Sequence, residues 1–371
     1  MARITMNTFI IAEAGVNHNG DLALAKRLID AGAACGADAV KFQTFQADQV
    51  VTRQAPKAEY QTKTTGTSES QLDMIRVLQL DEAAHLELID HARQRAVTFL
   101  STPFDLPSLE FLTTRCGLRT IKTPSGEITH PPYLLAVARA SQHVILSTGM
   151  STLAEVEAAL GILAFGFVAA AGSSPNPGDF EKAFVSTAGQ KALRQRVTLL
   201  HCTTEYPAPY GEVNLRALDT LSTAFGLPVG YSDHTLGCHV STAAVARGAV
   251  VIEKHLTLDR NLPGPDHKAS LEPAEFQALI RQIREVEYAL GDGGKRPTES
   301  EWKNRAIARK SLVAATMIRA GEVFTRDNLT CKRPGSGVSA ARWYEMLGVV
   351  ASRDYAPDDL IEVHNGSRAE E

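Results

Sequence analysis

The sequence has few cysteines and no pattern that would put them to structural use. Five occur among 371 residues, an odd number, and no two have C-x-x-C spacing. Disulfide frameworks and cysteine-rich zinc sites need paired or clustered cysteines, so neither is expected here. The expected location of the chain is therefore a reducing cytoplasm.

Long apolar runs and blocks of positive charge are also missing. No apolar stretch reaches the roughly 18 residues that a membrane span requires, and residues 1–7 are too short and polar for a signal peptide. The 38 Lys and Arg nearly balance the 42 Asp and Glu, giving a net charge of −4. We expect neither membrane insertion nor nucleic-acid binding. The P-loop, G-x-S-x-G and G-x-G-x-x-G signatures are absent from the sequence as well.

What remains is the profile of an ordinary globular protein, with 44% apolar and 22% charged residues. Its length exceeds what one core usually holds, which predicts a large domain joined to a small one. Residues 291–305 are rich in glycine and then in charge, as in a linker. We therefore predict a domain over residues 1–290, a linker over 291–305 and a second domain over 306–371.

Short apolar segments recur along the first 290 residues, and segments with helical spacing separate them. Strands this apolar, without clean alternation, are typical of a parallel sheet buried on both faces. Eight of them predict a (β/α)₈ barrel, with an open doubly wound sheet as the alternative. They are Thr8–Ala12, Ala39–Phe42, Val97–Leu100, Thr120–Lys122, Val144–Ser147, Val197–His201, Pro228–Tyr231 and Val250–Lys254. Two polar stretches, 50–71 and 166–196, are expected as surface loops.

Polar residues follow every one of these segments, at the end of a barrel where active sites lie. Lysines, small hydroxyls and glycine turns suit a phosphate or a phosphate plus a carboxylate. The candidates for that ligand are Lys41, Lys122, Ser125, Ser147 and Ser232. Glu13, Glu127 and Asp266 remain as acids for proton transfer or hydroxyl recognition.

Two histidines, His234 and His255, follow consecutive predicted strands and can converge in space. Imidazoles with nearby carboxylates suit Mn²⁺, Mg²⁺ or Zn²⁺. The spacing alone does not separate such a site from hydrogen-bonded histidines at the barrel mouth, and His201 is a competing ligand.

The motifs together resemble the sialic acid (nonulosonate) synthase family, in order and over nearly the whole chain. The matching segments are IAEAGVNHNGD, AVKFQTF, APKAEYQ, STPFD, PSGE, ILSTGM, LLHCTTEYPAP, GYSDHT, VIEKHLTLDR, PGPDHKASLEP and KRPGSG. The resemblance implies a catalytic TIM barrel followed by a small antifreeze-protein-like (SAF) domain. It further implies condensation of phosphoenolpyruvate with an N-acylated mannosamine-type sugar, a divalent metal (Mn²⁺ or Mg²⁺) and a domain-swapped homodimer.

Carried over by motif, the resemblance also implies roles for individual residues. His234 and His255 match the metal ligands, and Arg333 matches an arginine that reaches the partner subunit's site to hold the N-acyl group. The phosphoenolpyruvate positions are Lys41, Lys122, Ser125, Ser147 and Ser232, and the sugar positions are Glu13, Gln43, Thr102, Glu127, Tyr206 and Asp266. One departure is Thr204, where some members have Asn.

The sugar is the point that the sequence leaves open. We expect N-acetylmannosamine as substrate and N-acetylneuraminate as product, with Glu13 or Glu127 positioning the attacking water. The alternative is an N,N'-diacetyllegionaminate synthase acting on 2,4-diacetamido-2,4,6-trideoxymannose; pseudaminate synthesis is a further one. Outside this class stand an aldolase with Lys122 as Schiff base and a barrel without catalytic activity.

Overall fold

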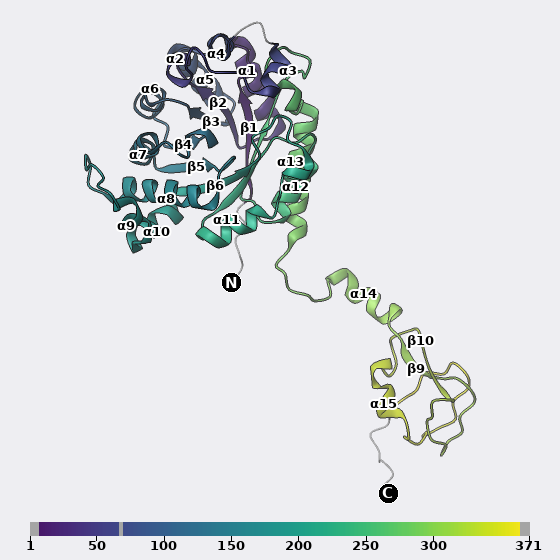
Figure 1. Cartoon of the computed structure of the whole chain (residues 1–371). Coiled ribbons are helices and arrows are strands. Elements are labelled where there is room, and N and C mark those ends of the chain that lie inside the picture. Colours follow the sequence, from purple (N-terminus) through teal and green to yellow (C-terminus); the bar gives the residue numbers. More distant parts are fainter. Residues whose placement is uncertain (1–6, 67–69, 364–371) are drawn as a thin grey trace. The chain divides into compact units, whose positions relative to one another are not determined.

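The computed structural model describes residues 7–66 and 70–363, and the chain divides into two compact units, Met1–Asp292 and Gly293–Glu371. The first unit is a barrel of eight parallel strands, each followed by at least one helix (Figure 1). The strands are β1 (Phe9–Gly15), β2 (Ala39–Thr44), β3 (Thr98–Pro103), β4 (Thr120–Thr123), β5 (His143–Ser147), β6 (Val197–Cys202), β7 (Val229–Asp233) and β8 (Val251–His255). The predicted barrel fold is therefore confirmed.

The strand order is β3-β2-β1-β8-β7-β6-β5-β4, in which neighbours are hydrogen-bonded. The end strands of this order, β3 and β4, lie in contact but share no ladder. The barrel is thus closed by backbone hydrogen bonds at every junction except the seam between β3 and β4.

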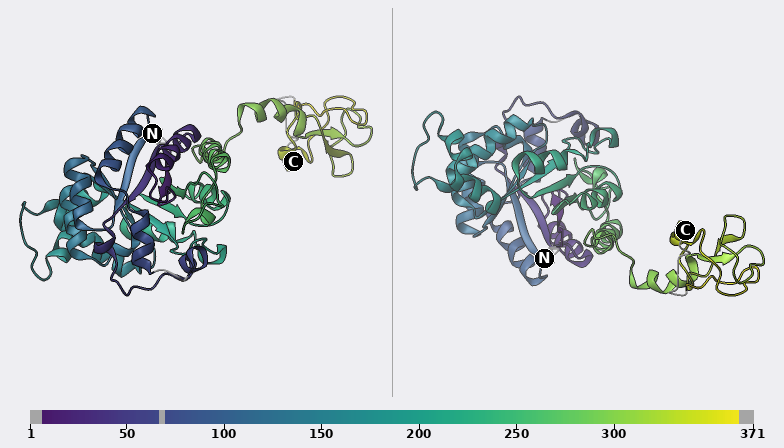
Figure 2. Two further views of the ribbon diagram at one scale, coloured as in Figure 1. Left: turned by 90° about the horizontal axis from the view of Figure 1, so that it is seen from above. Right: turned by 90° about the horizontal axis from the view of Figure 1, so that it is seen from below.

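Helices surround the strands on the outside, as the two views of Figure 2 show. Those that pack against the barrel are α1 (Leu22–Cys35), α5 (Glu82–Gln94), α6 (Leu106–Glu110) with a π-helical continuation (Phe111–Arg115), α7 (Pro131–Ala140), α8 (Leu153–Val168), α11 (Ala217–Phe225), α12 (His239–Ala246) and α13 (Pro273–Leu290). Their starts follow the usual capping chemistry: the Asp21 carboxylate accepts from the first backbone N–H groups of α1, and Thr152 forms a capping box with Glu155 on α8.

The two stretches expected as loops are partly helical, which corrects that expectation. The first contains α3 (Glu59–Thr65) and is flanked by α2 (Ala47–Val50) and α4 (Gln71–Leu78), and the second contains α9 (Asp179–Val185) and α10 (Thr187–Arg196). The reason is apolar anchoring: Ala183 and Leu193 are buried in the main core, and Phe180 packs against it. Within the second stretch, residues 169–178 and Ser186 lack helix.

Alternation along the strands divides the core into two parts. Inward positions near the start of the strands fill the barrel with Ile11, Ala39, Leu100, Ile145, Leu200 and Val251. Outward positions such as Ile10, Val40 and Ile252 pack against the helices. Because successive side chains of a strand point to opposite faces, the same alternation decides which polar residues reach the barrel mouth.

The second unit is a small domain with a core of its own. It contains α14 (Glu299–Ala308), an antiparallel pair β9 (Ser311–Ala314) and β10 (Leu329–Lys332), and α15 (Trp343–Met346). Leu312, Phe324 and Tyr355 are among the buried residues that form its core. The segment predicted as a linker contains the start of α14, which Thr298 caps. No helix in the described part of the chain is long and apolar enough to cross a membrane.

Candidate active site

Four buried charged side chains meet inside the barrel mouth. Glu13 Oε2 lies 2.6 Å from Lys41 Nζ, and Lys41 Nζ lies 3.6 Å from Glu253 Oε2. Lys122 approaches from β4, with Nζ 3.4 Å from Glu253 Oε1. Each of the four is at least 95% buried, and each occupies an inward position of its strand. A buried set of alternating charges is costly to assemble and is typical of functional sites.

Burial and mutual attraction set the protonation of these groups. Burial raises the pKa of Glu13 to about 7, although Lys41 opposes the shift. Burial alone would also raise the pKa of Glu253, but Lys122 and Lys41 outweigh it and lower that pKa to about 2. Glu253 is therefore the charged carboxylate between the lysines, and Glu13 can exchange a proton near neutral pH.

Hydroxyl groups surround the four charges. Lys41 Nζ donates to Thr102 Oγ1 at 2.9 Å, and the Ser232 hydroxyl donates to Glu253 Oε1 at 3.0 Å. Ser125 Oγ accepts from the backbone N–H of Gly149 at 2.9 Å. A Cβ at Gly149 would come within 2.8 Å of that same oxygen, which is too close for a side chain. Only glycine therefore allows the turn to approach Ser125 in this way.

The two predicted metal ligands lie side by side, with ring centroids 5.7 Å apart. His234 Nδ1 donates to the carbonyl oxygen of Thr203 at 2.6 Å, which leaves the lone pair on Nε2. Burial lowers the pKa of His234 to about 4 and that of His255 well below its ordinary value, so both imidazoles are neutral. His255 Nδ1 is buried without a hydrogen-bond partner among the described residues, 3.9 Å from Asp266 Oδ2.

These donors fit a divalent cation with open coordination positions. Neutral imidazole nitrogens are good ligands for Mn²⁺ and similar ions. Within residues 7–66 and 70–363, no group of three or more His, Cys, Asp or Glu converges as a complete metal site. The protein would thus supply His234 and His255, and water or substrate would supply the other ligands.

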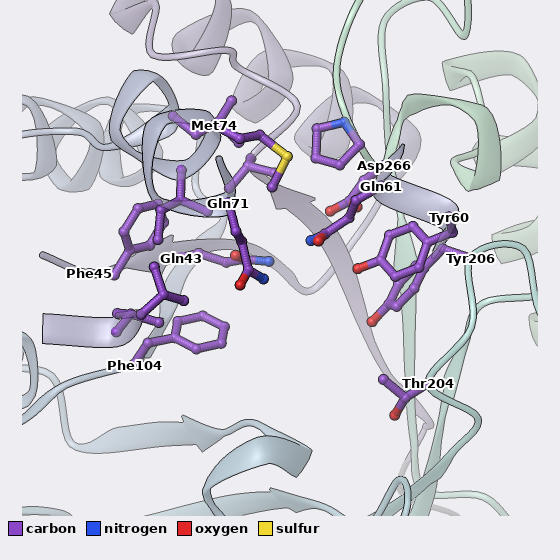
Figure 3. A pocket seen from close by; sticks show the side chains of 16 residues that line it. Gln43, Phe45, Tyr60, Gln61, Gln71, Met74, Phe104, Thr204, Tyr206 and Asp266 are labelled. Atoms are coloured by element: carbon purple, nitrogen blue, oxygen red, sulfur yellow. The ribbon is translucent and has the colours of Figure 1, made fainter. Parts of the chain in front are cut away.

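The site has two adjoining chambers. The inner chamber, about 260 Å³, is lined by the four charges, both histidines and the serines, among them Ser147. The outer chamber, about 240 Å³, is lined mainly by apolar and amide side chains (Figure 3). Gln43, Phe104, Thr204 and Tyr206 line both, so these four residues form the passage between the chambers.

Most of the residues predicted for the barrel site line these chambers, but Glu127 and the competing ligand His201 do not. Glu127 is absent from the described linings, and its carboxylate contacts His130 Nδ1 at 2.5 Å instead. His201 points to the outer face of β6, where Nε2 donates to the Val213 carbonyl, so it does not compete as a metal ligand. Arg333 belongs to the second unit, directly after β10.

Glu253 is the functional candidate that the sequence analysis did not select. The available signal was the alternation of β8: Val251 fills the barrel interior, so residues 253 and 255 must face inward as well. Cys202, which contacts Ser125 Oγ at 3.3 Å, follows from the same rule on β6.

Comparison with known proteins defines the class. The model of the NeuB family matches residues 28–295, and that of the SAF domain matches residues 309–362. The chain therefore belongs to the NeuB family, which confirms the resemblance to the nonulosonate synthases. It is an enzyme of that family.

Three individual relatives show how similar the chain is to particular synthases. The N,N'-diacetyllegionaminic acid synthase of Campylobacter jejuni is 53% identical over 95% of this chain and 98% of its own. The enzyme of the same name from Legionella pneumophila is 44% identical over 94% and 91%. The solved N-acetylneuraminic acid synthetase of Leptospira borgpetersenii, in complex with citrate, is 31% identical, with a TM-score of 0.64, over 82% of this chain and 94% of its own.

Proposed function

We propose that this enzyme is an N,N'-diacetyllegionaminate synthase, which condenses phosphoenolpyruvate with 2,4-diacetamido-2,4,6-trideoxymannose and releases phosphate. The proposal rests on sequence identity: two relatives of that name are 53% and 44% identical to this chain, whereas the N-acetylneuraminic acid synthetase is 31% identical. This favours the alternative product over the N-acetylneuraminate expected from the sequence.

Phosphoenolpyruvate would occupy the inner chamber. Its phosphate and carboxylate match two buried ammonium groups and the hydroxyls of Ser125, Ser147 and Ser232. Lys122 is the better phosphate donor, because its one described ionic contact, at 3.4 Å, goes to a carboxylate that it shares with Lys41. The carboxylate of Glu253 would keep both lysines charged and oriented.

The reaction joins C3 of phosphoenolpyruvate to the aldehyde carbon of the open-chain sugar. Water then adds to C2, and the bond between C2 and the phosphate oxygen breaks, which leaves the 2-keto acid and inorganic phosphate. The aldehyde oxygen becomes an alkoxide when the new C–C bond forms and must gain one proton, and a base must take one proton from the attacking water. Glu13 is suited to that task, since its pKa of about 7 lets it accept and return a proton near neutral pH.

His234 and His255 would hold Mn²⁺ or Mg²⁺ beside the sugar aldehyde. When bound, such a cation supplies Lewis-acid polarisation of a carbonyl oxygen. Mn²⁺ binding to chelator-treated protein, measured by calorimetry, should be lost in His234→Ala while the thermal melt stays nearly unchanged. Full Mn²⁺ affinity in the His234→Ala/His255→Ala double variant would overturn the assignment.

The decisive experiment measures phosphate release from phosphoenolpyruvate with each sugar offered alone. We expect kcat/KM for the diacetamido sugar to exceed that for N-acetylmannosamine at least tenfold, about 1.4 kcal/mol of transition-state preference. The reverse order would restore the neuraminate function, and preference for the pseudaminate-type sugar would point to that branch. Borohydride trapping with pyruvate should give no adduct at Lys122, whereas an adduct would indicate an aldolase.

A further inference from the structure

The outer chamber has an apolar wall that is not part of the main core. Val16, Phe45 and Leu78 are buried together as a separate cluster, and Ile75 and Phe104 pack against them. Phe45 and Phe104 meet edge to face, with ring centroids 6.3 Å apart. All five side chains also line the outer chamber, so the edge of this cluster is available to an apolar part of a ligand.

Met74, from α4, extends this apolar wall. Its side chain is 5% exposed and lines the same chamber as Phe45 and Phe104. Figure 3 shows these three labelled side chains on one side of the chamber, across from the neighbouring rings of Tyr60 and Tyr206. Those two rings have centroids 5.0 Å apart.

Three glutamines lie between the apolar wall and the tyrosines. Gln61 is partly engaged, because its Oε1 accepts from the backbone N–H of Ala58 at 3.0 Å. The side-chain amides of Gln43 and Gln71 are half-buried, and neither has a hydrogen-bond partner among the described residues. Both residues line the chamber and remain partly open to it, so their amides are free to pair with polar groups of a ligand.

We propose that the outer chamber selects the sugar: Met74, with Phe45 and Phe104, contacts the 6-methyl group, and Gln71 hydrogen-bonds the 4-acetamido group. This inference rests on the proposed function and assigns its specificity to residues. The orientation follows from the reaction. The sugar aldehyde must reach phosphoenolpyruvate in the inner chamber, so C4 to C6 extend through the passage at Tyr206 into the outer one.

The chamber chemistry matches both groups that distinguish the two sugars. A 6-hydroxyl against the thioether and rings would lose its hydrogen bonds to water without replacement, whereas a methyl group gains contact. A 4-hydroxyl is shorter than an acetamido group and offers one donor where the acetamido offers an N–H and a carbonyl. Gln71 can pair with both of these through its own carbonyl and NH₂.

The test is the preference ratio, defined as kcat/KM for the diacetamido-trideoxy sugar divided by kcat/KM for N-acetylmannosamine. Met74→Gln keeps the length of the side chain and should lower this ratio about tenfold, and Gln71→Met, which removes the amide, should lower it about as much. Val77→Gln is the matched control, because Val77 is on the same helix and is 67% exposed. It should leave the ratio unchanged, as should Met74→Leu.

The outcomes separate this inference from the proposed function. Wild-type enzyme that does not prefer the diacetamido sugar refutes the proposed function. Wild-type enzyme that does prefer it, together with an unchanged ratio in Met74→Gln and Gln71→Met, refutes the selector role of this chamber alone. The KM for phosphoenolpyruvate should stay close to wild type in all four variants, and equal losses with both sugars would likewise overturn the inference. The melting temperature should stay close to wild type in Gln71→Met, Val77→Gln and Met74→Leu, whereas Met74→Gln buries an amide and should lower it.

Discussion

Lys41 and Lys122 both contact Glu253, but Lys41 makes more contacts with the protein than Lys122 does. Lys41 also contacts Glu13 and donates to Thr102, and although burial lowers its pKa, the two carboxylates outweigh burial and raise it. For Lys122, burial dominates and lowers the pKa. The first lysine is thus tied into the protein, and the second is the more available to a ligand.

This difference predicts different defects for the two Lys→Met variants. Lys122→Met should raise the KM for phosphoenolpyruvate by about 10- to 100-fold with little change in stability, since a charge-assisted hydrogen bond contributes about 1.5–3 kcal/mol. Lys41→Met should also destabilise the barrel, by about 3 kcal/mol, because the buried Glu13 loses its ionic partner and Glu253 keeps only Lys122. Steady-state kinetics and thermal melts check both, with the exposed Lys26→Met as control. Equal stability of the two variants would contradict the argument.

His18 is a second residue whose charge the fold controls. It is fully buried, its Nδ1 accepts from the backbone N–H of Gly20 at 3.0 Å, and its Nε2 has no partner among the described residues. Burial lowers its pKa to about 4. The folded state therefore binds fewer protons than the unfolded state, so stability must fall as the pH drops through 6.5 toward 4.

We expect acidification from pH 7.5 to pH 5 to cost the wild type about 2 kcal/mol more than His18→Asn. The asparagine keeps an acceptor for Gly20 but does not titrate. Urea unfolding of both proteins at the two pH values measures the difference. If the two curves shift in parallel, the imidazole is not held neutral by the fold.

At the scale of elements, β7 and β8 are joined by a buried ion pair on their outer faces. Lys254 Nζ lies 3.1 Å from Asp233 Oδ2, and both side chains are fully buried. Asp233 also accepts from the Thr235 hydroxyl at 2.7 Å and from the Ser241 hydroxyl on α12 at 2.6 Å. The pair thus ties together the two strands that carry His234 and His255.

Removing one partner of this pair should be costly. Lys254→Met leaves the Asp233 charge buried without its cation, and we expect a loss of about 3–5 kcal/mol in the free energy of unfolding. The double variant Lys254→Met/Asp233→Asn should recover part of that loss, because the remaining amide is neutral. Denaturant unfolding measures both, and a single variant as stable as the wild type would show that the pair is dispensable.

The sequence predicted the position of a site residue well where the alternation of a strand sets the direction of its side chain. It predicted poorly in turns, where no such rule applies. Apolar runs predicted the barrel, and polar strand ends predicted that Lys41, Lys122 and His255 would meet. Glu127 follows a turn after β4, where no alternation sets the direction of a side chain, and it contacts His130 instead. The helices α9 and α10 were missed because a Gly- and Pro-containing segment precedes them and conceals the apolar spacing of Phe180 and Ala183.

At the scale of the whole molecule, the two units have separate cores, and Arg333 lies in the second. We propose that this arginine completes the site of a partner subunit in a domain-swapped homodimer. Arg333→Ala and Glu13→Ala should each be nearly inactive as homodimers. After mixing and reassociation in equal amounts, about one quarter of the wild-type sites should be complete, because half the dimers are mixed and each has one intact site.

The control for this mixing experiment is Arg333→Ala combined with the Arg333→Ala/Glu13→Ala double variant, which has no intact arginine to contribute. It should stay inactive. Purified mixed dimers of the two single variants that show no activity would indicate that each chain serves its own site.

The junction between β3 and β4, which lacks a ladder, should be the place where the barrel opens locally most easily. Without a ladder there, the amide groups on the facing edges of these strands should exchange with deuterium sooner than those of β1 or β8. Thr102 and Lys122 stand on the two sides of that seam, at the floor of the inner chamber. Lys41 donates to Thr102 on β3, and Lys122 lies on β4. An anion bound by both lysines would therefore link the two strands that share no backbone hydrogen bonds. Phosphoenolpyruvate should then slow hydrogen–deuterium exchange at β3 and β4 more than anywhere else in the barrel, because the bound substrate stabilises the one junction that lacks a ladder.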